Sequence, residues 1–192
     1  MNYFSSDQYV EPSRGDLLIS EPYLPDPNFE RTVVLLCEHD ENGTFGFVLN
    51  KRSPLTFNEV IEDVDHFDAP LFVGGPVQQN SLHFIHRAYD LMGSGKEIKE
   101  GLFWGGDFDK LLTLIDTHQV QLGDFRFFAG YSGWSPGQLE EELKVKSWIV
   151  YKNVDPDMLF TIPPDELWQN ILRNMGGKYK VMANYPLDPR LN

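Results

Sequence analysis

An uninterrupted apolar run at residues 32–37, Thr-Val-Val-Leu-Leu-Cys, limits the folds open to this chain. A run that is apolar at consecutive positions and rich in β-branched residues predicts a strand covered on both faces. Asn42-Gly43 follows, and this pair is typical of a type I′ turn, in which both central residues have positive φ. Residues 45–49 are therefore predicted to return antiparallel to the first strand.

Periodicity and cap residues predict the other elements. A Thr56-Glu59 capping box predicts a short helix, and Ser135 as N-cap with Pro136 and Gln138 predicts another helix start. Gly130–Trp134 is predicted to be a tight glycine-rich turn, and the polar segment 93–95 a flexible loop. Further strands are predicted at 16–20, 71–73, 81–86, 125–129 and around Trp148 and Val150, and further helices at 107–115 and 164–175.

Charge argues against a nucleic-acid partner. Lys and Arg total 16 against 29 Asp and Glu, a formal net charge of −13, and this charge repels a phosphate backbone. The single cysteine, Cys37, allows no intrachain disulfide and suits a reducing compartment. No apolar segment approaches the length of a membrane span or a signal peptide. We therefore expect a cytoplasmic protein without a membrane partner.

The sequence offers two candidate nucleophiles, and neither is excluded at this point. Ser132, in Gly130-Tyr-Ser-Gly-Trp134, lies where a nucleophile elbow places its serine, but Trp134 occupies the last glycine position. No histidine follows Ser132, because the last one is His118, so the usual order of a serine triad is excluded. Cys37 and His39 lie two apart on a predicted strand and can share a face, although a cysteine ending an apolar run is more often a core residue.

Metal and cofactor motifs are incomplete. His83 and His86 align only on a helix, whereas a strand sends them to opposite faces. The Asp63-x-Asp65-x-x-Asp68 spacing lacks the glycine and the third ligand of a calcium loop. Backbone amides in the Gly74-Gly75-Pro76 segment could hold an anion without specificity, but no P-loop or dinucleotide fingerprint accompanies them. We predict no metal and no cofactor.

An ordered series of motifs spans residues 15 to about 175: Gly15–Ser20 with Pro22, Asp26–Phe29, Arg31–Val34, Glu38-His39, Gly43–Asn50, Gly74–Val77, Gly130–Trp134, Gly137–Glu140 and Trp148. In these motifs the chain resembles the bacterial AlgH/YqgE protein family. The resemblance implies a single α/β domain of the α+β type, with a bent, partly barrel-like mixed sheet and flanking helices. It implies no established activity. One member's name suggests transcriptional regulation, but no helix-turn-helix is visible here.

We expect a loose arm at residues 1–14, one domain at 15–180 and a tail at 181–192. The leading hypothesis is a non-catalytic cytoplasmic binding or regulatory domain for a small molecule or a protein. The alternatives are a hydrolase or transferase using Ser132 or Cys37 with His39, and a transcription-linked regulator. Polar residues beside apolar strands meet at strand ends, so one pocket is predicted. Its candidate residues are Arg31, His39, Asn50, Gly74, Gly75, Pro76, Ser132, Trp134 and Gln138.

Overall fold

A computed structural model describes residues 10–187; residues 1–9 and 188–192, which belong to the predicted arm and tail, lie outside the described part. The strands are β1 (Leu17–Ser20), β2 (Val33–Asp40), β3 (Gly43–Val48), β4 (Arg52–Thr56), β5 (Pro70–Val73), β6 (Val77–His86), β7 (Lys96–Lys99), β8 (Leu102–Trp104), β9 (Phe125–Trp134) and β10 (Trp148–Tyr151). The helices are α1 (Phe57–Val60), α2 (Tyr89–Met92), α3 (Phe108–Asp116), the 3-10 helix η1 (Leu122–Asp124), α4 (Gln138–Lys144), α5 (Met158–Thr161), α6 (Pro164–Met175) and α7 (Gly177–Met182).

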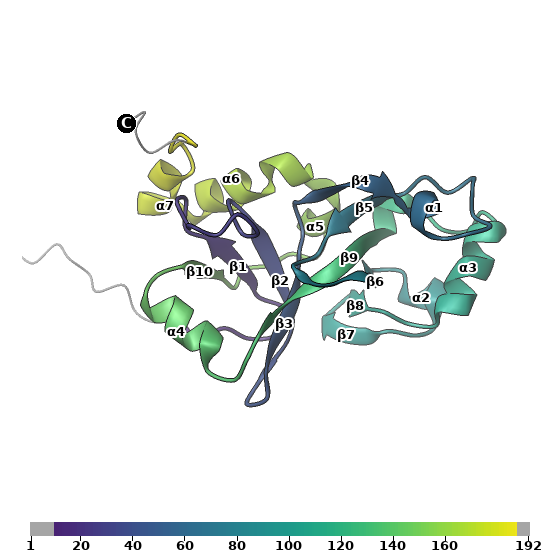
Figure 1. Cartoon of the computed structure of the whole chain (residues 1–192), viewed down its shortest axis with the longest axis horizontal. Helices are drawn as coiled ribbons and strands as arrows, with labels where there is room; N and C mark the ends of the chain where they lie inside the picture. Colours follow the sequence, from purple (N-terminus) through teal and green to yellow (C-terminus); the bar gives the residue numbers. More distant parts are fainter. Residues whose placement is uncertain (1–9, 188–192) are drawn as a thin grey trace, which may run out of the picture.

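All described strands belong to one mixed sheet. Its main path runs β10-β1-β2-β3-β9-β6-β8-β7, and β5 joins it through parallel pairing with β9 and carries β4. β9 crosses the centre of the molecule, with its first half paired to β5 and β6 and its second half to β3 (Figure 1). The path ends at β10 and β7, so the sheet bends without closing. The predicted α/β class with a partly barrel-like mixed sheet is confirmed.

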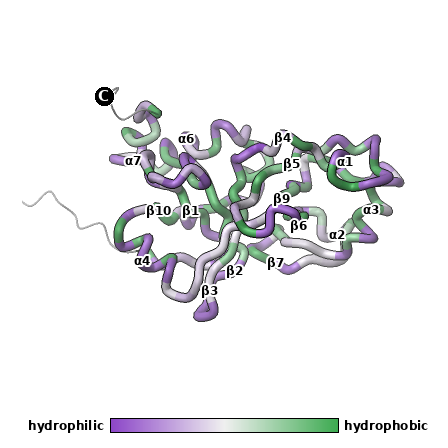
Figure 2. Tube along the Cα trace, viewed as in Figure 1, coloured by the Kyte–Doolittle hydropathy of each residue, from purple (hydrophilic) through white to green (hydrophobic). Residues whose placement is uncertain are grey.

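The predicted hairpin forms, but its turn lies one residue earlier. Asp40 pairs with Gly43, which leaves Glu41-Asn42 as the two-residue loop. The Asn42 amide donates to Asp40 Oδ1 at 2.8 Å, and Asn42 is not among the residues with positive φ. The type I′ prediction centred on Asn42-Gly43 is therefore wrong. Figure 2 shows that the tip of this hairpin is hydrophilic.

We expect Gly43→Val to destabilise the protein by about 2–4 kcal/mol, whereas Asn42→Ala has a small effect. Gly43 has a φ of +131°, and a Cβ there would lie 2.7 Å from the Trp134 carbonyl oxygen on β9. Asn42 needs no positive φ and loses only solvent contacts. Urea unfolding of both variants checks this; equal losses for the two variants would mean that the loop geometry is wrong.

The segment Gly130–Trp134 corrects a second prediction. It is not a turn, because Thr44 pairs with Trp134 and Gly46 pairs with Ser132, so the strand continues to its end at Trp134. The physical reason is that β3 offers a partner edge to β9 beyond the point where β5 stops. A strand-turn-helix elbow around Ser132 is therefore absent from this described segment.

Three groups of buried apolar side chains surround the sheet. The first joins β1, β2 and β3 to α6 through the helix face that the sequence predicted. The second joins α1 and α3 to the strands β5, β6 and β9, and the third joins Leu139 of α4 to the sheet together with Trp134 and Trp148. None of the helices within residues 10–187 is both long and apolar enough to cross a membrane.

Several short elements were not predicted. β4, β7, β8, α2 and α5 have three to five residues each, too few to show a full hydrophobic period. The segment 93–95, predicted as a loop, connects α2 with β7. Helix α7 follows α6 after Gly176 and crosses residue 180, where the predicted domain ends. The domain boundaries stay predictions.

Candidate functional site

Ser132 and the Gly74-Gly75-Pro76 loop meet where β5, β3 and β9 converge. The Ser132 side chain is fully buried, at 0% exposed, and its Oγ donates to the Gly74 carbonyl oxygen at 3.0 Å. The same oxygen accepts from the Val48 amide at 2.8 Å, and the Gly74 amide donates to Ala129 O. These polar groups thus complete the main-chain pairing of the sheet, and Pro76 beside them is exposed.

Trp134 and Gln138 meet a carboxylate that the sequence analysis did not single out. Glu142 Oε2 accepts from Trp134 Nε1 at 2.9 Å and from Trp148 Nε1 at 2.7 Å, while its Oε1 accepts from Gln138 Nε2 at 3.0 Å. Gln138 Oε1 also accepts from the Ser135 amide, as in the predicted cap. Helix α4 nevertheless begins at Gln138 after Gly137, so Ser135 is not its N-cap. This cluster fixes α4 on the sheet.

Cys37 and His39 both belong to β2 but lie in different environments. Cys37 is 1% exposed in the first core group, and burial raises the pKa of its thiol well above the usual range. The strand is bulged between Leu36 and Glu38. The His39 ring is bonded through Nδ1 to Thr44 Oγ1 at 2.6 Å, with Nε2 3.8 Å from Glu140 Oε1. Within residues 10–187, no hydrogen bond joins Cys37 to His39.

Arg31 and Asn50 hold chain segments together. Asn50 Oδ1 accepts from the Val33 amide, and its Nδ2 donates to the Arg31 carbonyl oxygen, both at 2.9 Å. Arg31 Nη2 donates to the carbonyl oxygens of Tyr185 and Pro186 at 2.7 and 2.6 Å. Its guanidinium carbon lies 5.0 Å from the centre of the Trp168 ring. Both side chains connect the start of β2 to more distant segments.

The contacts divide the nine predicted site residues into three sets. The first set lies around Ser132 in the sheet. The second lies around α4 and includes His39. The third consists of Arg31 and Asn50. None of the nine lines either of the two cavities described below. Their grouping around one cleft stays a prediction.

The larger cavity is an open groove of about 750 Å³ beside the α4–β10 connection and α7. Its walls include Leu24, Val145, Trp148, Tyr179 and Met182. The smaller is a pocket of about 300 Å³ bordered by β4, β5, β9, η1, α5 and the start of α6. Its lining contains Arg52 and Arg126 and no carboxylate.

Arg126 is the residue that the sequence analysis missed. It is 7% exposed, its Nη1 donates to Leu49 O at 3.2 Å, and its guanidinium carbon lies 5.0 Å from the centre of the Phe72 ring. The guanidinium carbon of Arg52 lies 5.4 Å from the same ring. Burial, and then the Arg52 charge, lower the pKa of Arg126 to about 10. The available signal was an arginine inside the apolar strand 125–129.

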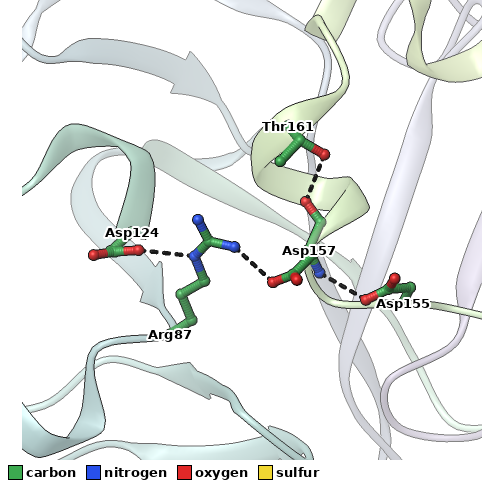
Figure 3. Close-up of polar contacts among 5 residues, drawn as sticks. All are labelled: Arg87, Asp124, Asp155, Asp157 and Thr161. Carbon is green, nitrogen blue, oxygen red and sulfur yellow. Dashed lines mark hydrogen bonds and ion pairs between the residues drawn. The ribbon is translucent and has the colours of Figure 1, made fainter.

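A third arginine, Arg87, joins two of the elements that border this pocket (Figure 3). Its Nε donates to Asp124 Oδ1 at 2.8 Å and its Nη1 to Asp157 Oδ1 at 2.6 Å, so it connects η1 with the start of α5. Asp157 is itself positioned, because its amide donates to Asp155 Oδ1 and its carbonyl oxygen accepts from Thr161 Oγ1. These bonds fix η1 and α5, and the pocket-lining residues that they carry, relative to each other.

The sheet and these sites define a bent, open-sheet α/β protein whose polar motif residues mostly serve its own main chain. The chain belongs to the AlgH-like family, whose model, DUF179, matches residues 17–180. A UPF0301 protein of Cytophaga hutchinsonii is 51% identical over 94% of this chain and 99% of its own length. A UPF0301 protein of Chlorobaculum tepidum is 42% identical over 93% and 95%.

Two solved structures share the fold. The AlgH protein from Pseudomonas aeruginosa superposes with a TM-score of 0.70 at 29% identity, covering 97% of this chain and 98% of that one. A Corynebacterium diphtheriae protein gives a TM-score of 0.76 at 24% identity, covering 93% and 95%. The predicted family membership is thus confirmed, and the family has no characterised activity.

Proposed function

We propose that this chain is a cytoplasmic protein that acts by binding, with a regulatory role, and that Ser132 and Cys37 do no chemistry. The observation that carries the proposal is the burial of Ser132, whose hydroxyl donates to Gly74 O inside the sheet. A nucleophile needs a neighbouring base and access to substrate. Ser132 has a main-chain acceptor in the place where a base would be needed.

The surroundings of Cys37 support the same proposal. A reactive cysteine is partly exposed and has a lowered pKa, because the thiolate is the nucleophile. Cys37 is buried among apolar residues, and its pKa is raised mainly by burial, against a smaller opposing effect of the Lys96 charge. The cavities, by contrast, lie away from both candidate nucleophiles.

We expect native protein to resist iodoacetamide at neutral pH and to react only after unfolding. Cys37→Ser should cost about 1–3 kcal/mol of stability, because a buried hydroxyl there must find a partner or remain unsatisfied. The rate is measured by mass spectrometry and the stability by urea unfolding.

The matched control is Ser135→Cys in the Cys37→Ser background, since Ser135 is exposed and its thiol should react at once. Modification of native Cys37 as fast as this control, with unchanged stability in the serine variant, would contradict the proposal. Labelling of Ser132 by a fluorophosphonate probe would contradict it as well.

A further inference from the structure

We propose that the pocket between Arg52 and Arg126 binds a small organic oxyanion, a carboxylate or a phosphate carried on an apolar or aromatic body. The inference rests on the proposed binding function and adds to it a site and a ligand class. It starts from two cations and no carboxylate in one pocket lining.

The first argument is the incomplete pairing of Arg126. A guanidinium has five N–H donors, and burying a charge is costly unless it is paired and hydrogen-bonded. Across residues 10–187, Leu49 O is the hydrogen-bond acceptor of the Arg126 side chain, and no carboxylate lies within ion-pairing distance. Contact with the Phe72 face offsets part of this cost. The remaining donors suit a bidentate oxyanion.

Other cations of the same chain show the contrast. Arg87 pairs with two aspartates, Lys152 pairs with Asp16, and Lys96 pairs with Glu38. The chain carries 29 acidic residues, so its composition does not explain why no carboxylate from residues 10–187 lines this pocket. The pocket instead places Arg52 on the same aromatic ring as Arg126. The Arg52 charge acts against the charged form of Arg126, and an anion bound in the pocket relieves that repulsion.

The second argument is the shape and rigidity of the pocket. Its volume of about 300 Å³ lies at the lower end of the range of about 300–1,000 Å³ found for small-molecule sites. Apart from Gly123, the rest of the lining is apolar and suits a hydrophobic body; it includes Ala69, Pro70, Phe72, Leu122, Phe125 and Phe160. Arg87 bonds to Asp124 and Asp157 (Figure 3), which fixes η1 with Leu122 relative to α5 with Phe160, so little ordering accompanies binding.

The experiment titrates the full chain with phenyl phosphate, benzoate and inorganic phosphate, and with benzyl alcohol as the neutral probe. Calorimetry gives the affinities, and backbone amide shifts of Gly123 and Phe125 locate the site. We expect phenyl phosphate or benzoate to bind at the pocket, inorganic phosphate to bind more weakly, and benzyl alcohol not to bind measurably. The stronger of the two aromatic probes identifies the anion as phosphate or carboxylate.

Variants connect the binding to the two arginines. Arg126→Lys should weaken binding about tenfold, because a lysine loses the bidentate geometry. Arg52→Gln should weaken it about fivefold, and this exposed residue can change without unfolding the protein. The control is Arg14→Gln, an exposed arginine outside the pocket with the same change of charge.

Absence of binding by any anionic probe would overturn the inference, and so would equal weakening by Arg52→Gln and Arg14→Gln. Both results leave the proposed non-catalytic function intact. Release of phosphate from phenyl phosphate, abolished by Arg126→Lys, would support the site and overturn the proposed function instead. The two failures are therefore distinguishable.

Discussion

We expect Gly75→Ala to lose about 4 kcal/mol or more of the free energy of unfolding, enough to leave little native protein in a domain of ordinary stability. Gly75 has a φ of +156°, and a Cβ there would lie 2.2 Å from the carbonyl carbon of Tyr131 and 2.4 Å from the Ser132 amide nitrogen. All these atoms belong to the main chain of β9. No side-chain rotation relieves such contacts, so the strand itself has to move.

The matched control is Gly123→Ala in η1, where a Cβ meets no atom of residues 10–187 within 4 Å. We expect this variant to unfold within error of the parent protein. Soluble expression, urea unfolding and near-UV circular dichroism compare the two. If Gly75→Ala retained parental stability, the loop would not approach β9 as closely as the structure indicates, and the buried bond between Ser132 and Gly74 would be in question.

Hydrophobic patterning was enough to predict much of the fold. The apolar run at 32–37 predicts a buried strand, and the spacing of Leu167, Trp168 and Ile171 predicts the buried face of a helix. Both patterns depend only on residues that are close together in the chain. Thr56 and Glu59 reported a cap for the same reason, and the Thr56 amide does donate to Glu59 Oε2 at 2.7 Å. Local signals predict elements well because their partners are local.

The course of β9 depends on distant partners and was therefore predicted only in part. Gly130 and Gly133 suggest a turn when read alone, yet β3 pairs with this segment and keeps it extended. The turn predicted at Asn42-Gly43 was placed one residue too late for a similar reason. Gly43 is required by the approach of Trp134, a residue about ninety positions away, rather than by the turn itself.

The candidate site was harder to predict than the fold. A polar side chain near a strand end can serve a ligand or the main chain, and sequence does not distinguish these uses. Ser132 and Asn50 both serve the main chain. Arg126 was not predicted as a site residue, because the strand around it is otherwise apolar and is typical of a buried core. That no carboxylate within residues 10–187 lines its pocket is visible only once β5, β9 and α5 are placed together.

The second large effect concerns the contact between α6 and the sheet. We expect Trp168→Ala to lose about 3–5 kcal/mol, the usual cost of removing a large buried aromatic side chain. Trp168 is 2% exposed in the first core group, and its Nε1 donates to Ser20 O at 3.0 Å. The variant leaves a cavity and a buried carbonyl oxygen without its donor. Urea unfolding followed by far-UV circular dichroism measures the loss.

Trp168→Phe separates the contributions to this loss. Phenylalanine keeps most of the apolar contact and a face for the Arg31 guanidinium, whose carbon lies 5.0 Å from the indole, but it cannot donate to Ser20. The loss should therefore fall to about 1–3 kcal/mol, the cost of one unsatisfied buried acceptor. If the phenylalanine variant lost as much as the alanine variant, the hydrogen bond rather than the packing would fasten α6 to β1. If neither variant lost stability, α6 would not be part of the core, and the pocket wall at the start of this helix would lose its support.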